Sequence, residues 1–488
     1  MDARLGWALA ALLLCGEVAA ILATDRLAAQ PVAFAASLST IAAAILVTAW
    51  CVYRRSSKRW SAVLLSPFAI AAATWAVLFV GRPIELYVFP DHASLALGEL
   101  GFDAAALTHA VALAGLGCAG WCAGYIVALG RSERQANASA PERRVHWGSA
   151  VLALAAGTVL WGTLFVHEGG LHALATSAVS VRADQRSSAY GFIGVWMVQG
   201  VGLCALTSLL RADGTDRRPL RMILAAAAVL SAAGAVALQV RGLAVFAGLS
   251  ALAVVLALRP PSTRKVVAGA AAAALLVLGL AFAQQVRAYT ARMTTTEAAR
   301  AAAHTPVWAD FASDLGTFDD LVAMSELVPA SIPSLHGATL REIPEALVPR
   351  GLWPGKPLGV DARAAAYLYP GAAVAVPISL QGELYWNDGL IAILVGSLLV
   401  GAAFGMIARV GLRFSAGSGP FLAYATVLPF THAFLTRGLA VMTENLIFAL
   451  VGVCVAAMAF GFRPQAAARR RLTLARWSLR AAPGDVDA

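Results

Sequence analysis

The sequence predicts an all-α, polytopic membrane protein with about 12 transmembrane helices and one long external loop that carries short helices. Of its 488 residues, 59% are hydrophobic and only 13% are charged, whereas soluble domains carry about 25% charged residues. Apolar runs of membrane-spanning length recur along the chain. In lipid such runs must be helical, because their backbone groups have no water to bind.

The expected spans follow the apolar runs in chain order. They cover 5–23, 31–53, 61–81, 103–129, 148–168, 190–210, 222–240, 242–258, 266–286, 386–410, 418–436 and 441–461. The first run is longer than a typical signal-peptide core and further spans follow it, so it is expected to be a transmembrane helix. The chain therefore divides into a bundle over 1–286, an external loop over 287–385, three spans over 386–462 and a basic tail over 463–488.

The basic residues indicate the orientation. Alternate short connections are rich in arginine, namely 54–59, 131–147, 211–221 and 259–265, and so is the tail. Basic loops stay in the cytoplasm, so both termini are predicted inside and 287–385 outside. The net charge of +10 follows from this pattern, and nucleic acid is not an expected partner.

Small residues within the spans, such as Gly396, Gly401 and Gly405, predict close helix packing. In the external loop, Thr305-Pro306 is typical of a helix start. Helical spacing then links Trp308, Phe311, Leu315, Phe318 and Val322, while the other face carries Asp310, Asp314, Asp320 and Ser325. We expect an amphipathic helix on the membrane surface or packed on the bundle, or else a soluble helix in a small cap.

Two arginines stand in tight turns between apolar runs, each followed by glycine. They are Arg241 in Gln239-Val240-Arg241-Gly242 and Arg437 in Leu435-Thr436-Arg437-Gly438. Charges at membrane depth are costly and usually functional, and guanidinium groups bind phosphate in a bidentate manner. The repeated pattern predicts an anion site, with snorkelling to lipid headgroups as the alternative.

Further cations are expected on the same outer side. They are Arg182, Arg186, Arg287 and Arg350, with Lys356 following the Trp353-Pro354 turn. Together they fit a polyanionic headgroup such as pyrophosphate. An ordinary solvated loop is the alternative, mainly for Arg292, Arg300 and Arg363.

Glu383 is the predicted catalytic base, because a carboxylate at the membrane interface is costly unless it is paired or used in chemistry. Tyr385 and Asn387 follow it and, together with Trp353, are predicted to contact substrate. Other candidate bases are Asp319, Asp320, His304 and His336, and Glu444 is placed to pair with Arg437. No Walker loop, HExxH motif or GxSxG motif occurs, so no cofactor and no metal are predicted.

Two segments carry a resemblance to a known family. Val348-Pro349-Arg350-Gly351-Leu352-Trp353-Pro354-Gly355-Lys356-Pro357 and Ser379-Leu380-Gln381-Gly382-Glu383-Leu384-Tyr385-Trp386-Asn387-Asp388-Gly389 resemble the oligosaccharide repeat-unit polymerases, the Wzy-type O-antigen polymerases. The two Arg-Gly turns and the long loop before the last three spans are also similar to that family.

This resemblance implies a membrane glycosyltransferase of the GT-C-like polymerase and ligase architecture in the bacterial cytoplasmic (inner) membrane. Its expected partner is undecaprenyl-pyrophosphate-linked glycan in the bilayer, and a chain-length regulator is a further candidate. The growing glycan would pass to the next lipid-linked unit, with Glu383 as base and the arginines on the pyrophosphate. An O-antigen-type ligase, which a histidine in the large loop typically marks, is the first alternative. A lipid-linked oligosaccharide flippase and a structural membrane protein are the others.

Overall fold

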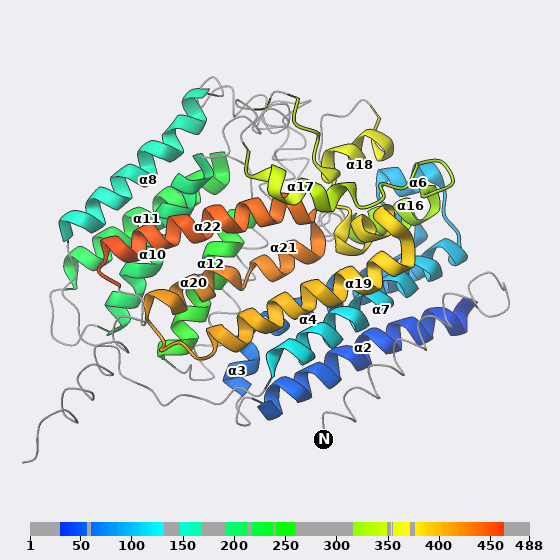
Figure 1. Ribbon diagram of the computed structural model, residues 1–488, viewed down its shortest axis with the longest axis horizontal. Helices are drawn as coiled ribbons and strands as arrows, with labels where there is room; N and C mark the ends of the chain where they lie inside the picture. Colours follow the sequence, from blue (N-terminus) through cyan, green and yellow to red (C-terminus); the bar gives the residue numbers. More distant parts are fainter. Residues whose placement is uncertain are drawn as a thin grey trace, which may run out of the picture.

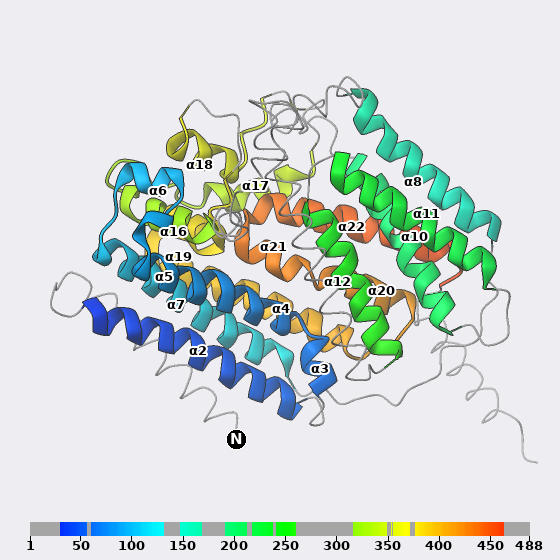
Figure 2. The ribbon, with the colours of Figure 1, turned by 180° about the vertical axis from the view of Figure 1, so that it is seen from behind.

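The structure of the chain, a computed structural model, describes residues 30–55, 60–130, 147–167, 191–211, 217–237, 241–259, 316–348, 353, 355–370 and 376–462. These residues form helices and no strand, so the predicted all-α class is confirmed. The helices lie side by side as a bundle, with shorter helices gathered at one end (Figures 1 and 2).

The helices before residue 260 make up most of the bundle. They are α2 (Gln30–Arg55), α3 (Trp60–Leu64), α4 (Pro67–Thr74), the π-helix η2 (Trp75–Gly81), α5 (Arg82–Val88), the 3-10 turn η3 (Pro90–His92), α6 (Leu95–Leu100), α7 (Ala104–Leu129), α8 (Trp147–His167), α10 (Gly191–Arg211), α11 (Arg218–Ala237) and α12 (Arg241–Leu258). The later helices are α16 (Gly316–Leu327), α17 (Ala338–Ala346), α18 (Val360–Leu368), α19 (Ser379–Gly411), α20 (Gly419–Val427), α21 (Phe430–Thr436) and α22 (Leu439–Ala459).

Within the described residues, six helical segments are long and apolar enough to cross a bilayer: Pro31–Arg55, Pro67–Val88, Ala104–Leu129, Gly191–Arg211, Ser379–Gly411 and Leu439–Ala459. Two shorter apolar helices, Trp147–Thr163 and Gly242–Leu258, coincide with two more of the expected spans. The expected spans 5–23 and 266–286 lie outside the described residues. The expected span 418–436 is two short helices, α20 and α21, which Leu428 and Pro429 separate.

The core of the bundle is the contact between α7 and α19. A methyl group on Gly401 would lie 2.0 Å from the carbonyl oxygen of Trp121, and one on Gly405 would lie 2.5 Å from that of Tyr125. The helix backbones therefore touch, which confirms the close packing predicted for these two glycines. Gly396 is different, because its neighbour is the Leu384 side chain, 2.4 Å from the added methyl position.

That contact shows that α19 reverses direction. In a straight helix Leu384 and Gly396 would stand about 18 Å apart. Asp388 and Gly389 instead have non-helical backbone angles, so Ser379–Asn387 folds back along the membrane-length helix that follows. The hook at the start of α19 in Figure 1 is this reversal. Hydrogen bonds satisfy the freed carbonyls, because the amides of Leu335 and His336 donate to Trp386 and Asn387 at 2.9 and 3.0 Å.

Helix α16 differs from the expected amphipathic helix. Phe318 and Val322 are buried as expected, but Asp320 and Ser325, predicted on a polar outer face, are buried as well. The reason is that α16 packs against α6, α7 and α19 together. The part of the prediction on 305–315 lies outside the described residues. α16 is thus an internal helix. It packs on the bundle, which is one of the arrangements expected from the sequence.

Candidate functional site

The carboxyl group of Glu383 is the centre of the candidate site. The side chain is fully buried, and its Oε2 accepts the Leu439 amide of the first residue of α22 at 2.7 Å. Its Oε1 is also buried and accepts no hydrogen bond from the described residues. The folded-back helix Ser379–Asn387 therefore holds a buried carboxyl group beside the Arg437-Gly438 turn, close to the Thr339 side chain.

A second carboxyl group, that of Asp361 on α18, reaches the same turn. Its Oδ1 accepts the Gly438 amide at 3.2 Å, so Glu383 and Asp361 bind consecutive amides at the start of α22. A methyl group on Gly438 would lie 3.2 Å from Asp361 Oδ1, 3.6 Å from Glu383 Oε2 and only 2.4 Å from Val360 Cγ1. We call Glu383 and Asp361 the carboxyl pair. The close approach of Val360 favours glycine after Arg437, because any added side chain would require Val360 to move.

Arg437 itself ends α21 in an extended conformation and is exposed. No described residue forms an ion pair with Arg437. Glu444 was its predicted partner, but the cation that acts on Glu444 is Lys356. The amides of Gly438 and Leu439, which follow Arg437, already bind the carboxyl pair, so these two amides are not available to an external anion. The guanidinium is therefore the group at this turn that remains available to an external anion.

Asn387 and Thr339 support the Glu383 helix. Asn387 is buried, and its Nδ2 donates to Thr339 Oγ1 at 2.7 Å and to the Glu383 carbonyl at 2.8 Å. Asn387 was predicted to contact substrate. In the structure its amide nitrogen ties α17 to the Glu383 helix.

The remaining predicted cations are placed only in part. Arg241 is the first residue of α12, as a turn between apolar helices requires. Lys356 Nζ donates to the Val348 carbonyl at 3.0 Å, and the Lys356 amide donates to the Trp353 carbonyl, also at 3.0 Å. Lys356 thus closes the turn after half-buried Trp353. The predicted anion ligands Arg182, Arg186, Arg287 and Arg350 lie outside the described residues.

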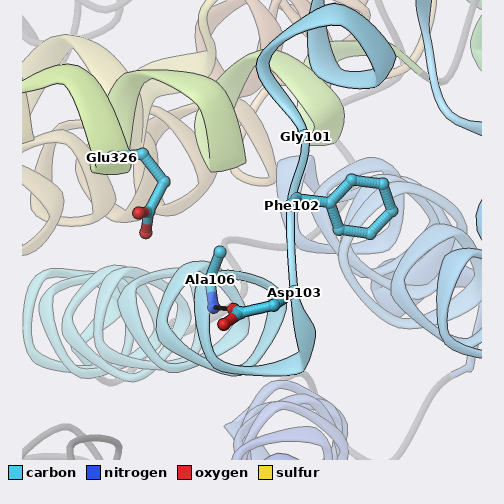
Figure 3. A pocket seen from close by; sticks show the side chains of 5 residues that line it. All are labelled: Gly101, Phe102, Asp103, Ala106 and Glu326. Carbon is cyan, nitrogen blue, oxygen red and sulfur yellow. Dashed lines mark hydrogen bonds between the residues drawn. The ribbon is translucent and has the colours of Figure 1, made fainter.

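Tyr385 faces away from the carboxyl pair. Its ring stands 6.1 Å from that of His109 on α7, edge to face. Nearby, a pocket of about 300 Å³ is lined by Gly101, Phe102, Asp103, Ala106 and Glu326 (Figure 3). The Glu326 carboxylate points toward the start of α7, and the Phe102 ring points away from it.

The lining of this pocket is acidic. Asp103 Oδ1 caps α7 by accepting the amides of Ala105 and Ala106, each at 2.9 Å. Burial raises the pKa of the Glu326 carboxyl, and the charge of Asp103 raises it further. A pocket with two carboxyl groups does not suit a pyrophosphate, so the anion site is expected at Arg437 instead.

Two of the other candidate bases are poorly suited. Arg82 is fully buried and binds Asp319 through two hydrogen bonds. Its Nε donates to Oδ1 at 2.9 Å and its Nη2 donates to Oδ2 at 2.8 Å. The Ser94 amide binds Asp319 Oδ2 as well, at 2.7 Å. Asp319 is thus committed to an ion pair. Asp320 is unsuited for a different reason: burial raises its pKa well above the usual range, and the charges of Asp319 and Asp361 raise it further.

Of the two histidine candidates, only His336 lies within the described residues. His336 is 80% exposed and adopts a left-handed backbone conformation. Its Nδ1 stands 3.2 Å from Asp388 Oδ1 at the reversal of α19. His304 lies outside the described residues.

Sequence reasoning missed Arg82 and Asp361. Arg82 had a signal, because it is a charge at the end of an apolar run in Gly81-Arg82-Pro83. Asp361 had none, since it is one of many polar residues in the long loop. In the described part of the chain no three His, Cys, Asp or Glu side chains gather as a possible metal site. Comparison with protein-family models, curated proteins and solved structures finds no match for this chain.

Proposed function

We propose that this protein is a membrane glycosyltransferase that polymerises lipid-linked oligosaccharide repeat units on the outer side of a bacterial cytoplasmic membrane. The proposal includes the finer expectations from the sequence, namely twelve spans, cytoplasmic termini and a GT-C-like architecture. Its lipid-linked substrate would carry undecaprenyl pyrophosphate. The resemblance of segments 348–357 and 379–389 to the repeat-unit polymerases supplies the reaction type.

The observation that carries the proposal is the pairing of a buried base with an exposed cation at one turn. Glu383 offers a buried oxygen with no hydrogen bond from the described residues, and Arg437 is exposed two residues before the amide that holds Glu383. A general base must be deprotonated and aimed at the acceptor hydroxyl. A fixed guanidinium stabilises the charge that develops on a departing pyrophosphate.

The transfer step needs no energy from a nucleotide. The acceptor hydroxyl oxygen bonds to the anomeric carbon of the growing glycan, and its proton passes to Glu383. The bond between that carbon and the pyrophosphate oxygen breaks, and the leaving pyrophosphate keeps the electron pair. Arg437 compensates the added negative charge, and Glu383 then returns its proton to solvent.

A second candidate function is the transfer of the glycan to a different acceptor, as in an O-antigen-type ligase. Its supporting observation is His336, an exposed histidine of the large loop that lies beside Asp388. We favour the polymerase because the carboxyl pair and Arg437 meet at one turn, whereas His336 lies at the α19 reversal and contacts Asp388.

The chain-length profile of surface glycan tests this choice. A strain that lacks the protein is complemented with wild type, Arg437→Ala, Arg437→Lys or His336→Ala. Arg413→Ala is the control, because Arg413 is an exposed arginine that follows the other end of α19. We expect single repeat units in the deletion strain, and a ladder with wild type, Arg413→Ala and His336→Ala.

Arg437→Ala should lose the ladder, since removing one stabilising donor costs about 10²–10³ in rate. Arg437→Lys should restore it only in part, because lysine lacks the bidentate fork. Full-length polymer left on its lipid carrier would instead support the ligase, as would a loss of attached glycan in His336→Ala. A failure of repeat units to reach the outer face would support a flippase.

A further inference from the structure

The carboxyl pair brings two acidic side chains to a single helix terminus. Glu383 comes from the folded-back start of α19 and Asp361 from α18, and they accept the amides of Leu439 and Gly438. Both carboxylate oxygens stand within 4 Å of the position where a side chain on Gly438 would begin.

The positive charge at this helix terminus is smaller than the negative charge that the two carboxylates would carry. A helix N-terminus supplies about half a positive charge, which favours one carboxylate but does not compensate two. No described cation forms an ion pair with Glu383. The charge of Asp361 is among those that act on Glu383, so each carboxylate makes ionisation of the other less favourable.

We propose that Asp361 is a positioning residue for Glu383: it fixes the Arg437–Leu439 turn that receives Glu383, and its charge makes Glu383 the stronger base. This inference rests on the proposed function, because it assigns Asp361 a part in the same transfer step. Asp361 also joins α18 to α22, so that the outer helices and the membrane helix meet at the reacting groups.

The other charged and titratable groups around the pair come from every neighbouring element. Acidic groups are Asp319 and Asp320 on α16, Glu342 on α17 and Glu444 on α22, and the tyrosine after α18 is Tyr369. Basic groups are Arg82, Lys356, Arg363 and Arg437, of which Arg82 binds Asp319 and Arg363 binds Glu342 at 2.5 Å. Arg82 and Arg363 are thus paired with other acids, and Asp361 is the acid that shares the turn with Glu383.

The test separates the geometric role of Asp361 from its charge. Asp361→Asn keeps an oxygen that can accept the Gly438 amide but removes the charge, whereas Asp361→Ala removes both. Asp91→Asn is the matched control, because Asp91 is exposed on η3. Elongation is measured against pH with purified full-length protein and the single lipid-linked repeat units that accumulate in membranes of the deletion strain.

We expect Asp361→Asn to retain activity, with the acidic limb of its pH–rate profile moved lower by about one pH unit. The limb moves down because Glu383 loses its proton more easily without a negative neighbour. Asp361→Ala should lose about tenfold or more in rate, since the turn is no longer fixed. Asp91→Asn should match wild type, and an unchanged limb in Asp361→Asn would overturn the inference.

Infrared titration of the same proteins gives a readout that does not need turnover. The carboxyl C=O band that Glu383→Gln removes should titrate at lower pH in Asp361→Asn than in wild type. If wild type elongates nothing at any pH, the proposed function fails while this coupling is still tested. Asp361→Ser is a second charge-free variant, and an unchanged titration of the Glu383 band in either variant would overturn the electrostatic role.

Discussion

Replacing Gly438 by alanine is expected to separate α18 from α22. The added methyl would lie 2.4 Å from Val360 Cγ1, more than 1 Å inside the ordinary carbon contact of about 3.5–4.0 Å. Gly438 has φ −62° and ψ 137°, a conformation that alanine adopts freely. The effect is therefore steric rather than conformational, and α18 must move by roughly 1 Å to relieve it.

The size of the effect follows from what that movement disturbs. Overpacking costs about 1–3 kcal/mol. The hydrogen bonds from Gly438 to Asp361 and from Leu439 to Glu383 are charge-assisted, and each contributes about 1.5–3 kcal/mol. Because both bonds weaken without breaking fully, we expect a total loss of about 2–5 kcal/mol, together with a large loss of polymerisation.

The chain offers a matched control in its other Arg-Gly turn. A methyl group on Gly242 would meet nothing within 4 Å, so Gly242→Ala should change stability by less than about 1 kcal/mol. Thermal unfolding of the purified proteins in detergent, with the glycan ladder of complemented cells, measures both effects. Equal stability and activity in Gly438→Ala and Gly242→Ala would refute the packing of α18 on α22.

Three further predictions concern the supports of the site. Asp319→Ala leaves Arg82 buried without its main partner and should lower the free energy of unfolding by about 3–5 kcal/mol, measured by thermal unfolding. Adding Arg82→Met should recover most of this stability. If it recovers none, the loss does not come from the Arg82–Asp319 pair. Because the pKa of Asp320 is raised in the folded state, wild-type stability should fall as pH rises above the ordinary aspartate pKa of about 3.9. Asp320→Asn should lack this decline, so its Tm should exceed that of wild type near neutral pH but not below about pH 4, and a constant difference would contradict the assignment. Gly401→Val should push α7 from α19 and lower the yield of folded protein in gel filtration, whereas Gly248→Val, in open space, should not.

The sequence was sufficient to predict the long apolar helices and one close contact between them. Long apolar runs with few charges predicted helices of membrane-spanning length, and small residues predicted the contact of Gly401 and Gly405 with α7. The reversal at Asp388 and Gly389 was not predicted, because Ser379–Asn387 precedes an apolar run and reads as its continuation. The backbone angles of Asp388 and Gly389 and the contact between Leu384 and Gly396 distinguish a folded-back helix from a straight one.

The site was predictable only where single residues were conspicuous. Arg437 stands alone in a turn, and Glu383 stands beside a span, so both could be singled out as costly charges. Asp361 acts on a turn 77 residues later in the chain, and Arg82 pairs with an aspartate 237 residues away. No periodicity or local motif encodes such long-range contacts. Both faces of α16 are buried for the same reason, since its neighbours come from distant segments.

The most direct test of the central claim is a reconstituted elongation reaction. Purified protein in liposomes receives single undecaprenyl-pyrophosphate-linked repeat units from the deletion strain, and glycan length and released lipid pyrophosphate are measured together. The account predicts one lipid pyrophosphate released for each unit added, with no release by Glu383→Gln. Movement of units across the bilayer without release, or full activity in Glu383→Gln, would contradict it.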